Sequence, residues 1–218
     1  MQSGICYLFG AGSHYGAPPK PKTGDFVMAI DGGLSYLQVW TMVPDLLVGD
    51  LDSLEAIPTG VETIRLPKEK DDTDMLAGLR IGLERGYGMF HIYGGTGGRF
   101  DHTMANIQCL AFLAQEGVRG YLFDEVTVMT AICRGGLSFS EGGTGELSAF
   151  SLTDISSGVC EEGFAYSLKD AVLQNTFPLG VSNQFIGLGV PGRVWVESGT
   201  LLLVYPKETL VAEIFACN

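Results

Sequence analysis

The sequence predicts an α/β protein made of an N-terminal Rossmann-like parallel-sheet domain and a C-terminal antiparallel β-sandwich domain. From the start to about residue 130, short apolar runs alternate with helical patterns, which is typical of a parallel sheet. Beyond the Gly135-Gly136 pair, strand patterns and turn signals continue without a convincing helical pattern, which indicates a small sandwich or barrel. We therefore expect domains at residues 1–130 and 136–218, joined near residues 125–136.

The first half carries its expected strands at 5–9, 26–30, 46–48, 61–66 and 89–93. Helical patterns fill residues 34–40, 74–85 and 103–115. Apolar residues recur at i, i+4 and i+8 in the second of these, so they share one face. Thr73 or Asp72 is a suitable N-cap for that helix, and Asp101 or His102 lies at the start of the next one.

The second half carries its expected strands at 137–139, 146–151, 158–164, 181–185, 193–196 and 201–205. Turn signals rich in Gly, Pro and Ser separate several of them, at 141–143, 156–158, 191–192 and 198–199. Short strands at this spacing favour an antiparallel arrangement.

Composition excludes several classes of protein. The 218 residues carry a net charge of −12, and a nucleic-acid-binding protein needs a basic surface that this chain lacks. No segment is apolar for long enough to span a membrane, and the N-terminus lacks the basic start of a signal peptide. The five cysteines form no CxxC pair, which favours free thiols in a reducing compartment, so we expect a cytoplasmic protein.

Five aspartates follow three of the expected strands. Asp50 and Asp52 come after the third strand, Asp71 and Asp74 after the fourth, and Asp101 after the fifth. A single Asp at such a place is more often a cap or turn residue, but the carboxyl ends of parallel strands share one edge of the sheet. Carboxylates that converge there predict a bound cation, most plausibly Mg²⁺, which prefers oxygen ligands.

Two glycine-rich loops suggest a nucleotide site. The loop 94–98 lies between a strand and a helix, where backbone N–H groups can bind phosphate, and Arg99 after it can add a bidentate contact. The loop 10–16 is one residue longer than the dinucleotide pattern GxGxxG, with Asp31 at a suitable distance to hold a ribose. This second signal fits a dinucleotide or the sugar and base of ATP. His14 and His91 are expected to be structural.

The second half offers weaker candidates. Residues 180–185 place polar groups in a strand-like run, and Tyr166 follows Gly163-Phe164. From the residues alone, outward-facing strand positions and a core aromatic are the favoured interpretation.

The ordered motifs resemble those of the thiamin pyrophosphokinases. They are Asp31-Gly32-Gly33, Gly49-Asp50-Leu51-Asp52-Ser53, Lys70-Asp71-Asp72-Thr73-Asp74 and the run from Gly94 to His102. The later segments Gly163-Phe164-Ala165-Tyr166-Ser167-Leu168, Gly180-Val181-Ser182-Asn183 and Gly199-Thr200-Leu201-Leu202 resemble the second domain of that family. The likeness covers nearly the whole chain, and it is the ordered set that is specific.

The resemblance implies a catalytic domain at 1–130 that binds ATP and Mg²⁺, and a domain at 136–218 that binds thiamin and forms a homodimer, with active sites at the subunit interface. It implies transfer of pyrophosphate from ATP to the thiamin hydroxyl. Mg²⁺ and the phosphates would be held by Asp50, Asp52, Asp71, Asp74 and Asp101. The nucleotide would contact Asp31, Gly32, Thr73, Gly94, Gly95, Gly97, Gly98, Arg99 and His102. Thiamin would contact Tyr166, Ser182 and Asn183.

In this reaction the hydroxyl attacks the β-phosphorus of ATP and AMP leaves. Either Asp74 or Asp101 would align the hydroxyl and accept its proton, and the sequence does not choose between them. A pyrophosphokinase for another alcohol, such as a pterin, is a close alternative. An NAD-dependent oxidoreductase would explain the first glycine loop but not the aspartates, and a vitamin- or nucleotide-sensing module would need fewer carboxylates.

Overall fold

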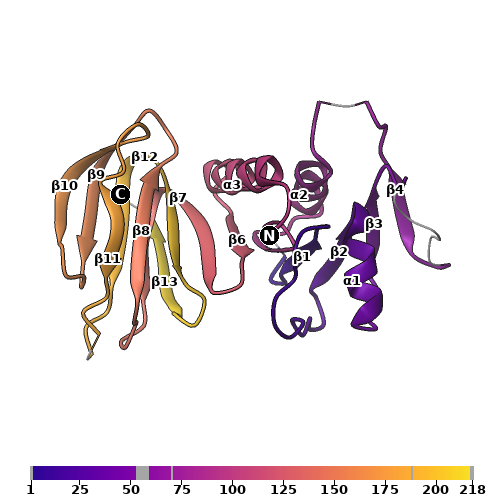
Figure 1. The fold of residues 1–218 in the computed structure, drawn as a ribbon, viewed down its shortest axis with the longest axis horizontal. Coiled ribbons are helices and arrows are strands. Elements are labelled where there is room, and N and C mark those ends of the chain that lie inside the picture. Colours follow the sequence, from indigo (N-terminus) through magenta and orange to yellow (C-terminus); the bar gives the residue numbers. More distant parts are fainter. Residues whose placement is uncertain (1, 53–58, 70, 188, 217–218) are drawn as a thin grey trace. The chain divides into compact units, whose positions relative to one another are not determined.

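The computed structural model describes residues 2–52, 59–69, 71–187 and 189–216 (Figure 1). The chain divides into two compact units. Unit 1 comprises residues 1–109 and 119–125, and unit 2 comprises residues 110–118 and 126–218.

Unit 1 is built on parallel strands in the order β6-β5-β1-β2-β3-β4. Their bounds are β1 Cys6–Phe9, β2 Phe26–Ile30, β3 Leu46–Gly49, β4 Glu62–Arg65, β5 Met89–Tyr93 and β6 Arg119–Phe123. The chain adds strands on one side of β1 and then returns to its other side with β5. Ligands of open parallel sheets bind where the strand order reverses in this way, so a site is expected beyond the ends of β1 and β5.

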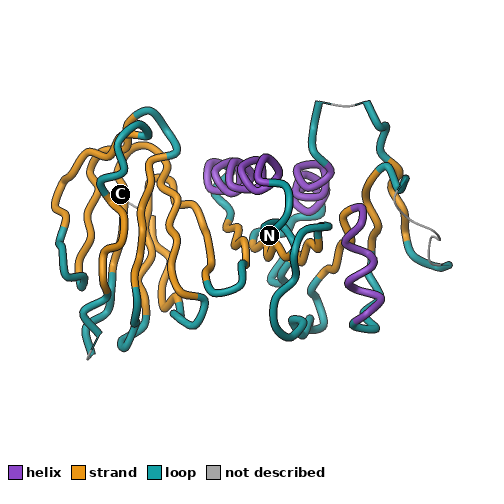
Figure 2. Tube along the Cα trace, viewed as in Figure 1, coloured by secondary structure: helices purple, strands orange, loops and turns teal. Residues whose placement is uncertain are grey.

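Helices cover both faces of this sheet. The 3₁₀ turn η1 (Asp31–Gly33) leads into α1 (Leu34–Val39), whose Leu34 and Leu37 share a buried cluster with Tyr7 and Phe9 of β1. Helix α2 (Asp74–Glu84) approaches the other face, where Leu8 points: a Cβ added at Gly78 would lie 3.1 Å from Leu8 Cδ2. Helix α3 spans Phe100–Gln115. Figure 2 shows these helices in purple beside the orange strands.

Unit 2 consists mainly of antiparallel strands. They are β7 Thr127–Phe139, β8 Glu146–Ser151, β9 Ile155–Glu162, β10 Leu168–Gln174, β11 Gly180–Gln184, β12 Arg193–Pro206 and β13 Val211–Ala216. The first part of β12 pairs with β9 and its last part with β8, and the pairing with β7 is irregular between Val196 and Thr200. Bulged strands that change partners make the corners of packed sheets. Phe139, Phe185 and Tyr205 fill the interior with edge-to-face contacts at 5.0–5.3 Å.

The mixed α/β class is confirmed, while the Rossmann-like and sandwich descriptions stay predictions. Three strands were not expected: β6, β10 and β13. The expected strands at 193–196 and 201–205 are one strand, β12, and β7 runs through most of the expected 125–136 joint. Helix α3 begins three residues earlier than expected, at Phe100. No described helix is both long and apolar enough to cross a membrane.

Candidate functional site

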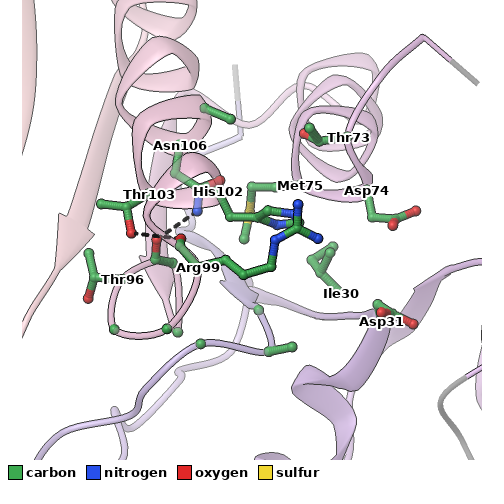
Figure 3. Close-up of a pocket in the computed structure, with 18 residues that line it drawn as sticks. Ile30, Asp31, Thr73, Asp74, Met75, Thr96, Arg99, His102, Thr103 and Asn106 are labelled. Carbon is green, nitrogen blue, oxygen red and sulfur yellow. Dashed lines mark hydrogen bonds between the residues drawn. The ribbon is translucent and has the colours of Figure 1, made fainter.

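A cavity of about 240 Å³ opens beyond the carboxyl ends of β1, β2 and β5, within unit 1 (Figure 3). Its walls come from residues 10–12 after β1, Ile30 and Asp31 at the end of β2, residues 73–75 at the start of α2, the loop 94–99, and the first turns of α3. This is the position that the reversal of strand order predicts.

The floor of the cavity is backbone, because the two glycine loops bond to each other. Gly12 N–H donates to Gly94 O at 2.8 Å, and Ser13 N–H donates to Thr96 O at 2.8 Å. A Cβ added at Gly12 would lie 2.3 Å from Thr96 O, so a side chain has no room there. Gly97 has φ 66°, a conformation that favours glycine. Loops of this kind bring backbone N–H groups close to an anion.

Three side chains that the sequence analysis did not single out as site residues hold these loops. Asn106 is buried, and its Nδ2 donates to Gly95 O at 2.7 Å. Thr96 Oγ1 donates to Asp124 Oδ1 at 2.6 Å. Asn106 could have been found from the sequence, because it is a polar residue on the otherwise apolar face of α3. Asp124 could not, because it follows β6, a strand that was not expected.

His14 supports the first glycine loop from below. Its Nε2 lies 2.9 Å from Gly10 O, and its ring centroid is 3.8 Å from that of Tyr36. Burial lowers the pKa of His14, although its hydrogen bond to Gly10 O raises it. The ring is therefore neutral at pH 7, and Nε2 carries the proton that is donated to Gly10 O. These contacts support a structural role for His14, which stays a prediction.

Asp74 is the predicted metal ligand that lines the cavity. Asp31, which was predicted to contact the nucleotide, lines it as well. Asp74 begins α2, whose N-cap is Thr73: its Oγ1 accepts from Leu76 N–H at 3.2 Å. Asp31 begins η1 with φ 47°, a conformation that is uncommon for a residue with a side chain. Figure 3 shows both carboxylates on the side of the cavity opposite Thr96 and Thr103.

Four other predicted aspartates are not among the described residues that line the cavity: Asp50, Asp52, Asp71 and Asp101. Asp52 pairs with Lys68 at 3.0 Å, and Asp50 Oδ1 accepts from Asp52 N–H at 3.0 Å. Gly32 also lies outside the lining, within η1. Ser53 and Lys70 of the predicted motifs fall outside the described residues.

The metal prediction is only partly matched by the placement of donors. In the described ranges, no group of three or more His, Cys, Asp or Glu side chains gathers in a way that would hold an ion. Asp31 and Asp74 supply carboxylate oxygens at the cavity, and these are the ligands that Mg²⁺ prefers. The role of all five aspartates in metal binding stays a prediction.

Arg99 extends across the cavity from the start of α3 (Figure 3). Its Nε donates to Asp101 Oδ1 at 3.1 Å, and this hydrogen bond holds the pKa of the Asp101 carboxyl below its ordinary value. The two side chains are 72% and 63% exposed, and exposed ion pairs are weak. The guanidinium can therefore exchange this carboxylate for the phosphate of a ligand at little cost.

A second predicted region lies in unit 2. Asn183 is buried: its Oδ1 accepts from Tyr166 N–H at 3.0 Å, and its Nδ2 donates to Tyr166 O at 2.6 Å. Ser182 is exposed, with φ 58°, where the pairing of β11 with β8 is irregular. The interpretation of Tyr166 as a core aromatic is wrong, since it is 72% exposed. Asn183 does not face outward, because the bulge before it turns its side chain into the interior.

The comparisons with known proteins agree with this geometry. Residues 21–122 match the family model of the thiamin pyrophosphokinase catalytic domain. The matched residues make up a little under half of the chain, and this part of the sequence is similar to the thiamin pyrophosphokinase catalytic domain. None of the curated proteins searched matches the chain.

Solved structures of thiamin pyrophosphokinases share the fold. The Bacillus subtilis structure is 20% identical, with a TM-score of 0.80, over 93% of this chain and 98% of that chain. The Geobacillus thermodenitrificans structure is 22% identical, with a TM-score of 0.80, over 93% and 97%. The yeast structure is 16% identical, with a TM-score of 0.72, over 94% and 87%.

Proposed function

We propose that this protein is a Mg²⁺-dependent thiamin pyrophosphokinase, which transfers the pyrophosphoryl group of ATP to the hydroxyl of thiamin and releases AMP. The observation that carries the proposal is the cavity itself: glycine-loop backbone on one side, Asp31 and Asp74 on the other, and Arg99 across it. Phosphoryl transfer depends mostly on positioning and on neutralising charge, and these groups supply both.

In the proposed reaction the loop 94–98 and the N-terminus of α3, which both line the cavity, bind the phosphates, because glycine-rich loops and helix N-termini favour anions. Arg99 leaves Asp101 and stabilises the negative charge that grows on the transferred group. Asp31, which lines the cavity at the end of β2, would bind the ribose. The glycine floor keeps the phosphates close to the backbone and excludes water from that side.

Mg²⁺ would neutralise phosphate charge when bound, and Asp74 is the predicted ligand that lines the cavity. We assign the hydroxyl proton to Asp74 rather than to Asp101, because Asp74 lines the cavity and Asp101 lies outside the described lining. Asp50, Asp52, Asp71 and Asp101 would complete the metal and phosphate contacts, as the resemblance implies.

Thiamin is assigned to unit 2, where Tyr166 and Ser182 are exposed and Asn183 fixes the backbone of Tyr166. An exposed Tyr ring offers a stacking face to the cationic thiazolium. The resemblance further implies a homodimer with active sites at the subunit interface and a cytoplasmic location. Domains at 1–130 and 136–218, Rossmann-like and sandwich-like, belong to the same proposal.

The test is AMP release from ATP and Mg²⁺, with and without thiamin, followed by mass detection of thiamin diphosphate. AMP and thiamin diphosphate are expected together, and only when the metal is present. ADP in place of AMP would contradict attack at the β-phosphorus. Turnover with a pterin but not with thiamin would favour the alternative acceptor. Thermal stabilisation by NAD without metal would favour an oxidoreductase instead.

A further inference from the structure

A carboxyl group is enclosed in unit 2 without a full set of partners. Glu161 of β9 is 0% exposed. Its Oε2 accepts from Asn183 Nδ2 at 2.5 Å, while its Oε1 has no hydrogen-bond partner among the described residues. Burying a carboxyl with an unsatisfied oxygen is costly, so stability of the fold does not explain Glu161.

In the hydrogen bond between Asn183 and Glu161, the Asn183 amide nitrogen is the donor. Tyr166 N–H donates to Asn183 Oδ1 at 3.0 Å, and Tyr166 O accepts from Asn183 Nδ2 at 2.6 Å. Reversing the amide would place two donors together and two acceptors together, so Nδ2 is the group that faces Glu161. Glu161 therefore acts as an acceptor that holds the Asn183 amide in this orientation.

The amide in turn joins the two segments that carry exposed groups. Tyr166 follows β9, and Ser182 precedes Asn183 in β11. The segments are linked by Ala165 N–H, which donates to Gln184 O at 2.8 Å, and by the two bonds from Asn183 to Tyr166. Ser182 N–H donates to Ser148 Oγ at 3.0 Å, which fixes the bulge from the other side.

We propose that Glu161 is a positioning residue for substrate binding by unit 2: through Asn183 it sets the separation of Tyr166 and Ser182. The substrate class is a planar, cationic heterocycle that stacks on Tyr166 and is met by the Ser182 hydroxyl. This inference rests on the proposed function for the identity of that substrate. Burial raises the pKa of Glu161, while the bond from Asn183 lowers it. Glu161 Oε2 can accept the hydrogen bond from Asn183 whether the carboxyl is ionised or protonated. Positioning of Asn183 therefore depends on the acceptor oxygen and not on the charge.

The test compares KM for thiamin, KM for ATP and kcat in the wild type and three variants. Glu161→Met fills the space but removes the acceptor, and Glu161→Gln keeps an acceptor without the charge. Glu162→Gln is the matched control, because Glu162 is the exposed neighbour on the same strand. We expect Glu161→Met to raise KM for thiamin by about tenfold or more, with kcat and KM for ATP unchanged. Glu161→Gln is expected to rescue KM for thiamin.

An unchanged KM for thiamin in Glu161→Met, or an equal rise in Glu161→Gln, would overturn the inference. If Glu161→Met does not fold, Glu161→Asp replaces it in the test, because its side chain is one methylene shorter and its carboxyl does not reach Asn183. The expected rise in KM for thiamin, and the results that would overturn the inference, are then the same. If the wild type makes no thiamin diphosphate, the proposed function fails and hydrogen exchange decides the inference. Faster exchange of Tyr166 N–H in Glu161→Met, restored in Glu161→Gln, supports it; unchanged exchange overturns it.

Discussion

The two predicted binding regions are built from different parts of the polypeptide. The cavity of unit 1 is formed by backbone: two glycine loops bond to each other, and Arg99 with its partner Asp101 is largely exposed. The region of unit 2 is formed by side chains: Asn183 and Glu161 are buried, and their hydrogen bonds set the backbone of Tyr166. The first is lined largely by glycine-rich backbone, and the second carries an exposed aromatic ring, that of Tyr166.

This difference determines what each region tolerates. A backbone floor suits phosphate, which needs several N–H groups at short range, and it fails when a Cβ is added. A side-chain network suits a shaped organic substrate, and it fails when a hydrogen-bond partner is removed, because the other partner is then buried and unsatisfied. The substitutions below test the comparison from each side.

The largest effect is expected from Asp74→Asn, which keeps the size of a cavity-lining side chain and removes its charge. Loss of a metal ligand and proton acceptor should lower kcat by roughly 10²- to 10⁴-fold. The fold should persist, as judged by thermal melting. Asp72→Asn is the control, because Asp72 pairs with Arg80 at 2.7 Å and does not line the cavity. Wild-type rates in Asp74→Asn would rule out its assigned role.

The two units should respond to acid in opposite directions. Burial lowers the pKa of His91 from 6.5 to about 4, so its stabilising contribution is present above pH 6.5 and is lost as the pH falls towards 4. Burial raises the pKa of Glu161 above 4.5, so its contribution is present below pH 4.5 and is lost as the pH rises through the folded-state pKa. His91 should cost unit 1 about 2 kcal/mol between pH 7.5 and pH 5.

The measurement is urea unfolding at pH 7.5 and pH 5, followed by tryptophan fluorescence. Trp40 adjoins α1 in unit 1, and Trp195 lies in β12 of unit 2, so single-tryptophan variants report each unit. His91→Phe should reduce the loss of stability in acid, and Glu161→Gln should increase it. The same pH dependence in wild type and His91→Phe would show that other groups govern acid unfolding.

A smaller effect is expected from Gly12→Ala, which tests the backbone floor directly. The added Cβ would lie 2.3 Å from Thr96 O and 2.6 Å from Gly94 O, so the two loops must separate. We expect a loss of about 1–3 kcal/mol in unfolding free energy and weaker ATP binding, measured by calorimetry. Gly16→Ala, in the same loop, controls for backbone strain alone: no atom lies within 4 Å of the added Cβ, but φ is 73°, so it should lose stability without weakening ATP binding. Equal ATP affinity in both variants would contradict a floor made by Gly12.

The sequence predicts the elements whose signals are local. Strands 26–30 and 89–93 match β2 and β5 at both ends, because each is an apolar run bounded by turns. The expected strand at 146–151 matches β8 in the same way. Strand β10 was missed because its sequence LKDAVLQ does not alternate apolar and polar residues, and it is mostly exposed at the end of the sheet order. Its pairing with β9, more than its own residues, makes it a strand.

In the candidate site, too, residues with local sequence signals were predictable and residues that act through long-range contacts were not. The glycine loops, Asp31, Asp74 and Arg99 were predictable because strand ends in a parallel sheet share an edge. Residues that act through long-range contacts were not: Asp124 reaches Thr96 from 28 positions away, and Glu161 reaches Asn183 from 22. Sequence spacing carries no information on such pairs. Tyr166 was misplaced because aromatic residues are usually buried, and here the backbone bonds to Asn183 hold it at the surface.

The smallest effect is expected from Asp101→Asn, on stability. Asp101 and Arg99 are exposed, and exposed ion pairs contribute little to stability, so the urea midpoint of unfolding should stay close to that of the wild type. A clear fall in that midpoint would mean that the pair is part of the structural framework of unit 1. Activity separates two roles for Asp101. If its carboxylate only holds Arg99 between turnovers, Asp101→Asn keeps its kcat, and if it binds metal or phosphate, kcat falls as in Asp74→Asn.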